Sequence, residues 1–92
     1  MKGKGLNASI IQEWNEWVYS IVQGIATELG ERFLIMHVFD PENGTEKIIV
    51  KDKKISIEYT IFITNYTNEF RKNREEEREK IINFFLLAVT GK

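Results

Sequence analysis

The sequence predicts an α+β domain with the element order α-β-β-β-α, a three-stranded antiparallel meander with flanking helices. Three observations carry this prediction. Apolar residues recur at helical spacing from Ile10 to Leu29, short strand-like runs separated by turn residues follow over residues 32–64, and a second helical pattern comes after them. The 92 residues leave room for one hydrophobic core. We therefore expect one domain over residues 1–92, with residues 1–8 as a flexible N-terminal tail.

The first helix is expected to begin at Ser9. Gln12 follows three residues later, a capping-box pattern in which each side chain satisfies a free backbone N–H. The apolar stripe of this helix includes Trp14 and Trp17, which we interpret as core residues because the stripe is regular. Gly30 suits the left-handed position that follows the last turn of a helix.

Three strands are expected next, over residues 32–39, 45–51 and 54–64. The first is apolar on both alternating faces and lies too close to Gly30 to continue the helix. The turn over residues 40–44 is the clearest local signal, because Pro fixes φ at its second position and glycine at its end can adopt a positive φ.

Turn lengths predict how the strands pair. The first hairpin would place Phe39 near Glu46. A two-residue turn at residues 52–53 would join the second strand to the third and place Lys51 opposite Lys54.

The two faces of this sheet would differ. The face expected to pack on the helices holds Phe33, Ile35, His37, Phe39, Ile48, Val50, Ile55, Ile57, Tyr59, Ile61 and Ile63. The opposite face mixes apolar side chains with Ser56, Glu58, Thr60 and lysines, and it is more apolar than a solvated face should be. We predict that this face binds a partner through Leu34, Met36, Val38, Lys47, Ile49, Lys51, Lys54 and Phe62.

The last helix is expected to start near Thr67 or Asn68 and to run to about Thr90. Residues 71–80 are almost all charged and are expected to lie in water, whereas residues 81–89 are apolar nearly all round and are expected to be enclosed. One helix and three strands give little cover for such a segment. We therefore expect a homo-oligomer, most simply a homodimer.

The residue types exclude most catalytic chemistry. Cysteine is absent, and His37 is a lone histidine without a second ligand or a nucleophile beside it, so it is expected to be a hydrogen-bonded core or edge residue. The acidic residues at 75–77 and 79 alternate with basic residues at helical neighbour spacings, which favours pairing within the helix over metal binding. We expect no catalytic residues, no metal and no cofactor, and we predict that the protein is not an enzyme.

A basic cluster of Arg71, Lys72 and Arg74 near the start of the last helix gives an alternative. Together with the α-β-β-β-α order it resembles the double-stranded-RNA-binding domain, whose second helix also begins with basic residues. The hairpin loop of that family contains Gly-Pro-x-His, whereas residues 41–44 here are Pro-Glu-Asn-Gly, and Glu75 follows the basic residues at once. The resemblance implies a nucleic-acid-binding module, although the net charge of −1 provides no general attraction to nucleic acid.

The leading functional hypothesis is a small protein-binding module in the cytoplasm. The N-terminus lacks an apolar signal core, and the longest apolar run, residues 81–89, is far shorter than the roughly 20 residues that span a bilayer. The composition is rich in Ile, Lys and Asn and poor in Ala, which suggests an AT-rich coding sequence. By analogy with small inhibitors from phages and mobile elements, we expect an anti-CRISPR-like viral protein that acts on a defence factor in the host cytoplasm.

Overall fold

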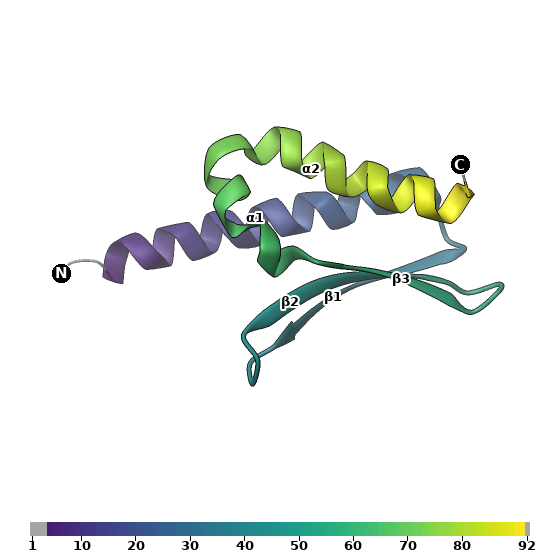
Figure 1. Ribbon diagram of the computed structural model, residues 1–92, viewed down its shortest axis with the longest axis horizontal. Helices are drawn as coiled ribbons and strands as arrows, with labels where there is room; N and C mark the ends of the chain where they lie inside the picture. Colours follow the sequence, from purple (N-terminus) through teal and green to yellow (C-terminus); the bar gives the residue numbers. More distant parts are fainter. Residues whose placement is uncertain (1–3, 92) are drawn as a thin grey trace.

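A computed structural model of the protein describes residues 4–91, including all side chains in that range except those of residues 4–8, 68 and 69. The elements are α1 (Lys4–Leu29), β1 (Phe33–Asp40), β2 (Thr45–Asp52), β3 (Ile57–Phe62), a 3-10 helix η1 (Ile63–Tyr66) and α2 (Thr67–Thr90). The predicted order α-β-β-β-α is confirmed. The strands form one antiparallel sheet in the order β1-β2-β3, and both helices lie on the same side of it (Figure 1).

Helix α1 is longer than the sequence predicts. It begins at Lys4, so Ser9 lies inside the helix and its predicted role as the first cap is wrong. Each residue added to an existing helix brings one more backbone hydrogen bond, and this gain competes with a cap worth about 1 kcal/mol. Of the predicted tail, residues 4–8 are helical and residues 1–3 lie outside the described residues. The other end agrees with expectation, since Gly30 has φ +81° and its N–H donates to the Ala26 carbonyl at 3.0 Å.

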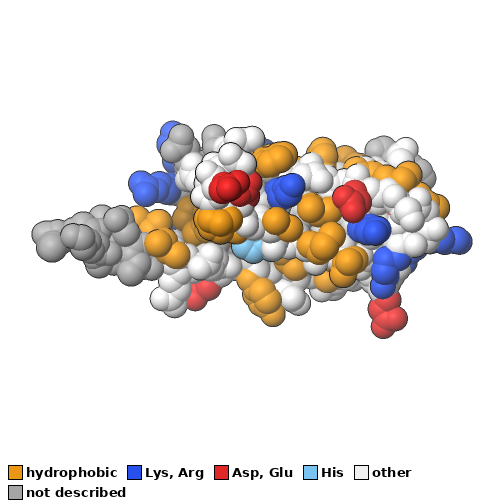
Figure 2. Space-filling model, turned by 90° about the horizontal axis from the view of Figure 1, so that it is seen from below, with side chains coloured by type: hydrophobic (Ala, Val, Ile, Leu, Met, Phe, Trp, Pro, Cys, Tyr) orange, Lys and Arg blue, Asp and Glu red, His pale blue; other side chains and the backbone are white. Residues whose placement is uncertain are grey.

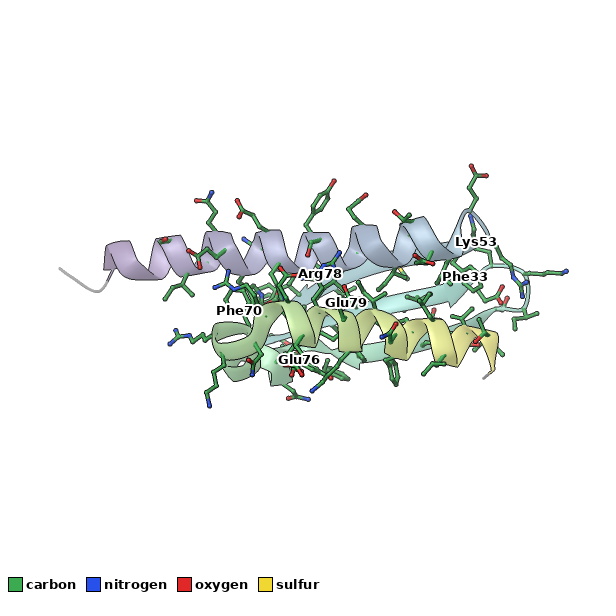
Figure 3. All side chains as sticks on the ribbon, turned by 90° about the horizontal axis from the view of Figure 1, so that it is seen from above. Phe33, Lys53, Phe70, Glu76, Arg78 and Glu79 are labelled. Carbon is green, nitrogen blue, oxygen red and sulfur yellow. The ribbon has the colours of Figure 1, made fainter. Side chains whose placement is uncertain are left out.

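The hydrophobic core lies between the helix pair and the sheet. Seen from above, α1 and α2 run side by side over the strands (Figure 3). Trp17 is 4% exposed, which confirms its assignment to the core. The helices approach closely at Gly24, where an added Cβ atom would lie only 2.7 Å from Ile82 Cδ1. Arg78 reaches between the two helices and donates from Nε to Ser20 Oγ at 3.1 Å.

The predicted core face of the sheet is covered only in part. Ile48 and Val50, in the middle of β2, are fully buried under the helices. Phe39 and Ile57 were expected beside them, but both are exposed. Phe39 is the next-to-last residue of β1 and Ile57 is the first of β3, so each lies at a strand end. The helices therefore pack on the middle of the sheet and leave these strand ends exposed.

The first hairpin has the predicted register. Phe39 pairs with Glu46 across the antiparallel strands. Gly44 has φ +66°, and its N–H donates to the Asp40 carbonyl at 2.8 Å. The Asp40 carboxylate also accepts the Glu42 N–H at 3.0 Å, which closes the turn from its first position.

The second hairpin differs from the prediction. Residues 53–56 form a four-residue turn, so Lys51 pairs with Glu58 and the predicted pairing of Lys51 with Lys54 is wrong. Ile55 lies in this turn and is 50% exposed, although it was expected on the core face. The shift is four residues, an even number. Because side chains alternate along a strand, the residues that remain in β3 keep their predicted faces.

Asp52 explains the longer turn. It is 2% exposed, and its carboxylate accepts hydrogen bonds from Arg32 Nε at 2.9 Å, Arg32 Nη2 at 2.7 Å and the Lys54 N–H at 2.9 Å. The bond from Arg32 is the main cause that holds the pKa of Asp52 below its usual range, and the backbone donors add to it. Ser56 has φ +61° and donates its N–H to the Asp52 carbonyl at 2.7 Å. The turn is therefore built around one satisfied carboxylate, and it also avoids placing two lysines opposite each other.

Helix α2 has the predicted bounds, but it is kinked and its apolar half is less enclosed than predicted. Gly91 follows it with φ +75°, while Asn73 interrupts it with φ −136° and ψ 54°, so a kink separates a short first segment from the rest. Ile63, predicted in the last strand, is fully buried in η1. The apolar half is only partly enclosed, because Phe84 is 45% exposed and Leu87 is 54% exposed. A helix at the edge of a two-layer fold has one side against the core and leaves the other in water.

Candidate protein-interaction surface

One face of the sheet carries no helix among the described residues, and we call it the open sheet face. Strand pairing places Leu34 beside Lys51, Met36 beside Ile49, and Val38 beside Lys47. Pairing of β2 with β3 adds Phe62 beside Lys47. The open sheet face is thus defined by Leu34, Met36, Val38, Lys47, Ile49, Lys51 and Phe62. These are seven of the eight predicted partner-binding residues, and the eighth, Lys54, lies in the turn after β2.

Apolar side chains lie on all three strands of the open sheet face, and its two lysines lie on the middle strand, β2. Leu34 is 44% exposed and Phe62 is 47% exposed, whereas Met36, Val38 and Ile49 are half-buried against their neighbours. Hydrophobic side chains spread across this side of the molecule with both basic and acidic side chains among them, as Figure 2 shows. The Lys47 ammonium lies 5.6 Å from the centroid of the Phe62 ring, within range of a cation–π interaction. The surface is an apolar area that carries charges of both signs, since Asp40 and Glu58 share it with Lys47 and Lys51.

A recess deepens the open sheet face at the end nearest the first hairpin. Its volume is about 560 Å³, and its lining includes Val38, Phe62, Lys47 and Asp40. A hydrogen bond from the Asn43 side chain, at 2.7 Å, is the main cause that lowers the pKa of the Asp40 carboxyl, and nearby Lys47 contributes to the same shift. The recess is therefore lined by apolar side chains together with the Asp40 carboxylate and the Lys47 ammonium. This arrangement suits a large apolar side chain that carries a polar neighbour.

A second cluster lies on the helix side, where α1 crosses the first hairpin. Glu46 bridges two partners, because its Oε1 accepts the Trp14 Nε1–H at 2.8 Å and its Oε2 lies 2.8 Å from His37 Nε2. The hydrogen bond confirms the expected role of His37 as a bonded edge residue. Sequence reasoning missed the partners, although the predicted pairing of Phe39 with Glu46 already placed that carboxylate on the same face as His37, two residue pairs along the sheet. The hydrogen bond from the Trp14 indole to Glu46 joins α1 to the first hairpin, so the contacts of this cluster are structural.

The basic residues of the nucleic-acid alternative are partly engaged within the protein. The Arg74 guanidinium lies 4.4 Å from the Phe70 ring centroid and 3.3 Å from a Glu13 oxygen, and the Arg74 carbonyl accepts the Trp17 indole N–H at 2.8 Å. Arg71 and Lys72 are exposed on α2. Because α2 lies on the other side of the sheet from the open sheet face and its lysines, the structure does not gather the basic residues into one surface.

Two of the four glutamates in the acidic run of α2 are paired within the helix. Glu77 accepts from Lys80 Nζ at 3.1 Å, and Arg78 Nη1 lies 2.6 Å from a Glu79 oxygen. Over residues 4–91, no cluster of three or more His, Cys, Asp or Glu side chains has a metal-binding arrangement. Neither helix in the same range is both long and apolar enough to cross a membrane.

Comparison with known proteins finds no relative of this chain. No protein-family model matches the sequence, and no curated protein or solved structure matches the chain. The function is therefore inferred from the residues of the chain and their geometry.

Proposed function

We propose that the protein is a non-enzymatic protein-binding module that docks its partner on the open sheet face. The observation that carries the proposal is the exposure of large apolar side chains on that face, with Leu34 at 44% and Phe62 at 47%. Exposed apolar side chains that share one face of a protein often mark an interface with another protein.

The composition of the rest of the sheet supports this proposal. On the helix side, Ile48 and Val50 are fully buried, as core residues should be. An antiparallel sheet with one covered face normally has polar side chains on the other. Here Met36, Val38 and Ile49 are apolar residues on the face away from the helices. Strands β1 and β2 therefore carry apolar side chains on both faces, as strands that are covered on both sides do. A docked partner would supply the second cover.

Binding of nucleic acid is the less favoured function. A phosphate backbone is bound by several basic side chains on one surface, but Arg74 already contacts Phe70 and Glu13. The residues that follow it, Glu75 and Glu76, are exposed carboxylates that would repel phosphate. Binding of RNA or DNA, measured by a gel-mobility shift, would favour this alternative if it weakened steeply with added salt and were lost in Arg71→Glu.

The identity of the partner is a finer part of the proposal. Small size, an α+β fold without a metal-binding cluster in the described residues, and the composition of the chain support an inhibitor of a host defence factor, of the anti-CRISPR type. This support is by analogy with other small inhibitors. Co-expression with a defence system in a phage plaque assay would test it, since an inhibitor restores infection.

A matched pair of substitutions tests the binding surface. Phe62 and Phe84 are nearly equally exposed, at 47% and 45%, but Phe62 lies on the open sheet face and Phe84 on α2. Each is replaced by serine in a tagged chain, and proteins retained from a cell lysate are quantified beside the free energy of unfolding. We expect Phe62→Ser to lose the retained partner while stability changes by no more than about 1 kcal/mol. Phe84→Ser should keep the partner.

Two results would overturn the proposal. One is a partner that both variants retain equally well, because the open sheet face would then not be the docking site. The other is a loss of several kcal/mol of stability in Phe62→Ser, which is typical of a core residue and not of an exposed one.

A further inference from the structure

We infer that two copies of the chain pair through β1 and form a dimer with one continuous sheet. The two β1 strands run antiparallel about a two-fold axis at Met36, so that Met36 of one copy lies beside Met36 of the other. Two three-stranded sheets then join into one of six strands. The contact uses the edge of the sheet, so it leaves the open sheet face available to the partner of the proposed function.

Strand β1 is an edge strand that its sequence does not protect. Over residues 4–91 the sheet has the order β1-β2-β3, so one side of β1 has no neighbouring strand. The strand is eight residues long, contains no lysine, arginine, glutamate or proline, and pairs with β2 without a bulge. Natural proteins usually block a long edge with charged residues, proline or a bulge. The other edge strand, β3, is shorter and carries Glu58, with Lys53 and Lys54 in the turn before it. Of the two edges, β1 is therefore the one open to a further strand.

The backbone groups on the free side of β1 follow from the register. The Lys53 N–H donates to the Arg32 carbonyl at 3.1 Å, so these two residues form a hydrogen-bonded pair. Bonded and non-bonded pairs alternate along an antiparallel ladder, so the even-numbered residues of β1 bond to β2. The N–H and C=O groups of the odd-numbered residues therefore point to the free side. These residues are Phe33, Ile35, His37 and Phe39. A second extended chain would satisfy all of these groups at once.

The sequence of β1 selects a second copy as that chain. Counted from Met36, the residues three positions away in both directions are phenylalanine, and those two positions away are both aliphatic. The proposed axis pairs Phe33 with Phe39, Leu34 with Val38, and Ile35 with His37. A two-fold axis requires a surface to be complementary to itself, and a strand with this symmetry meets that requirement.

The same register agrees with the hydrogen bonds and the charges. It pairs odd-numbered residues with odd-numbered residues, so every free backbone group of β1 has a partner. Residues 33–39 contain no Asp, Glu, Lys or Arg, and the residues opposite each other at the ends, Arg32 and Asp40, have opposite signs. Self-pairing therefore brings no like charges together, which would be unfavourable across a strand pair.

An exposed phenylalanine and a hollow lie at the end of β1. Phe39 is 58% exposed although it is on the helix side of the sheet. The hollow beside it has a volume of about 430 Å³ and lies between β1 and α1, with Phe39, His37, Ile11 and Asn15 in its lining. In the dimer, Phe33 of the second copy comes to this end of the strand, and the hollow gives its ring room beside Phe39.

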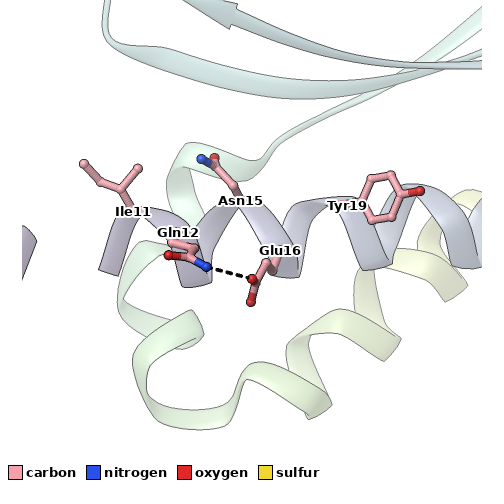
Figure 4. Close-up of a pocket in the computed structure, with 5 residues that line it drawn as sticks. All are labelled: Ile11, Gln12, Asn15, Glu16 and Tyr19. Carbon is pink, nitrogen blue, oxygen red and sulfur yellow. Dashed lines mark hydrogen bonds between the residues drawn. The ribbon is translucent and has the colours of Figure 1, made fainter. Parts of the chain in front are cut away.

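The outer face of α1 continues the surface that the second copy covers. Helix α1 makes its main sheet contacts with β1, and α2 with β3. Ile11 is 57% exposed and Tyr19 is 65% exposed, and Figure 4 shows them at the two ends of a second hollow, of about 420 Å³. Ile11 and Asn15 line both hollows, so this face of α1 borders the free side of β1. The two-fold axis places both α1 helices on the same side of the joined sheet, where each covers part of the other's outer face.

Single cysteines test the register directly, because the chain has none of its own. Met36→Cys places a thiol on the axis, where the Cα atoms of a non-bonded antiparallel pair are about 4.5 Å apart, within the roughly 4.4–6.8 Å of disulfides. Leu34→Cys is the matched control, since Leu34 is on the same strand and face and is more exposed. Its two copies would be roughly 13 Å apart, because residue 34 lies opposite residue 38.

The rate of cross-linking under oxidised glutathione is the measurement. We expect Met36→Cys to form the covalent dimer roughly tenfold faster than Leu34→Cys, because only the first pair of thiols has disulfide geometry. A mixture of Leu34→Cys with a tagged Val38→Cys should cross-link faster than either variant alone. In urea, where the chain is unfolded, all of these rates should become equal.

Sedimentation velocity provides the second measurement. The unaltered chain should dimerise at high micromolar concentration, and Phe62→Ser should dimerise equally well, because Phe62 lies on β3 and not at the axis. A chain that stays monomeric overturns the inference, and so does cross-linking of folded Leu34→Cys as fast as that of Met36→Cys. Loss of the dimer in Phe62→Ser also overturns it, because the copies would then meet through the open sheet face. None of these results affects the proposed function, which the Phe62→Ser capture experiment tests with a different protein as partner.

Discussion

The close approach of the two helices at Gly24 predicts a specific coupling between α1 and α2. A Cβ at position 24 would lie 2.7 Å from Ile82 Cδ1, well inside the separation of roughly 3.5–4.0 Å at which carbon atoms attract each other. The perturbation is Gly24→Ala, made both in the unaltered chain and together with Ile82→Val. Valine at position 82 lacks the Cδ1 atom, so the contact that opposes the alanine disappears.

The expected free energies follow from these contacts. Alanine favours the helix over glycine by about 1 kcal/mol, and overpacking a core costs about 1–3 kcal/mol, so Gly24→Ala alone should destabilise the protein by about 1 kcal/mol. Ile82→Val alone removes one buried methyl group and should also cost about 1 kcal/mol. Without Cδ1, the nearest atoms to the new Cβ are Arg78 Nη2 at 3.4 Å and Ile82 Cγ1 at 3.6 Å. Gly24→Ala should then stabilise by about 1 kcal/mol, which gives a coupling of about 2 kcal/mol.

Urea unfolding followed by circular dichroism measures all four proteins of this cycle. Gln23→Ala combined with Ile82→Val provides the control, because Gln23 is an exposed neighbour of Gly24 on α1. The control pair should be additive to within about 0.5 kcal/mol. If Gly24→Ala changed stability equally with isoleucine and with valine at position 82, the close contact between the helices would be refuted.

Two further predictions concern the turns. Gly44→Val should destabilise the protein by about 1 kcal/mol or more in thermal or urea unfolding, because φ is +66° there and a β-branched residue resists positive φ; an unchanged melting curve would contradict it. The lowered pKa of Asp52 means that its carboxylate stabilises the fold above the ordinary aspartate pKa of about 4, and that this contribution is lost as pH falls through the lower folded-state pKa. Unfolding measured from neutral to acidic pH should therefore show a smaller acid-dependent loss in Asp52→Asn than in the unaltered chain, and parallel curves would show that Asp52 contributes no pH dependence.

Most of the fold could be predicted from local signals, and the errors lie where distant residues decide. The stripe of α1, the glycine turn at Gly44 and the left-handed Gly30 each depend on neighbours in sequence, and all three are confirmed. The turn after β2 could not be predicted, because Arg32 lies 20 residues before Asp52 and only the folded sheet brings them together. The kink at Asn73 has no comparable signal in the sequence.

Most residues of the open sheet face could be predicted from the sequence, but the position of Lys54 could not. Alternation along β1 and β2 fixes which side chains share a face, so Leu34 and Ile49 could be placed without the structure. Lys54 could not, because its position depends on the length of a turn. The exposure of Ile11 could not be predicted either, since this residue belongs to the apolar stripe of α1 by its spacing and yet is 57% exposed. Partner binding itself stays a prediction.

The order of elements along the chain has a consequence for synthesis in the cell. The meander is complete at Phe62, but Ile48 and Val50 on its inner side are covered only when α1 and α2 meet over it. Because α2 is made after everything that it covers, the newly made sheet has apolar side chains uncovered on both faces until residues 67–90 have emerged. A nascent chain stalled before that point would be prone to aggregation and a substrate for chaperones.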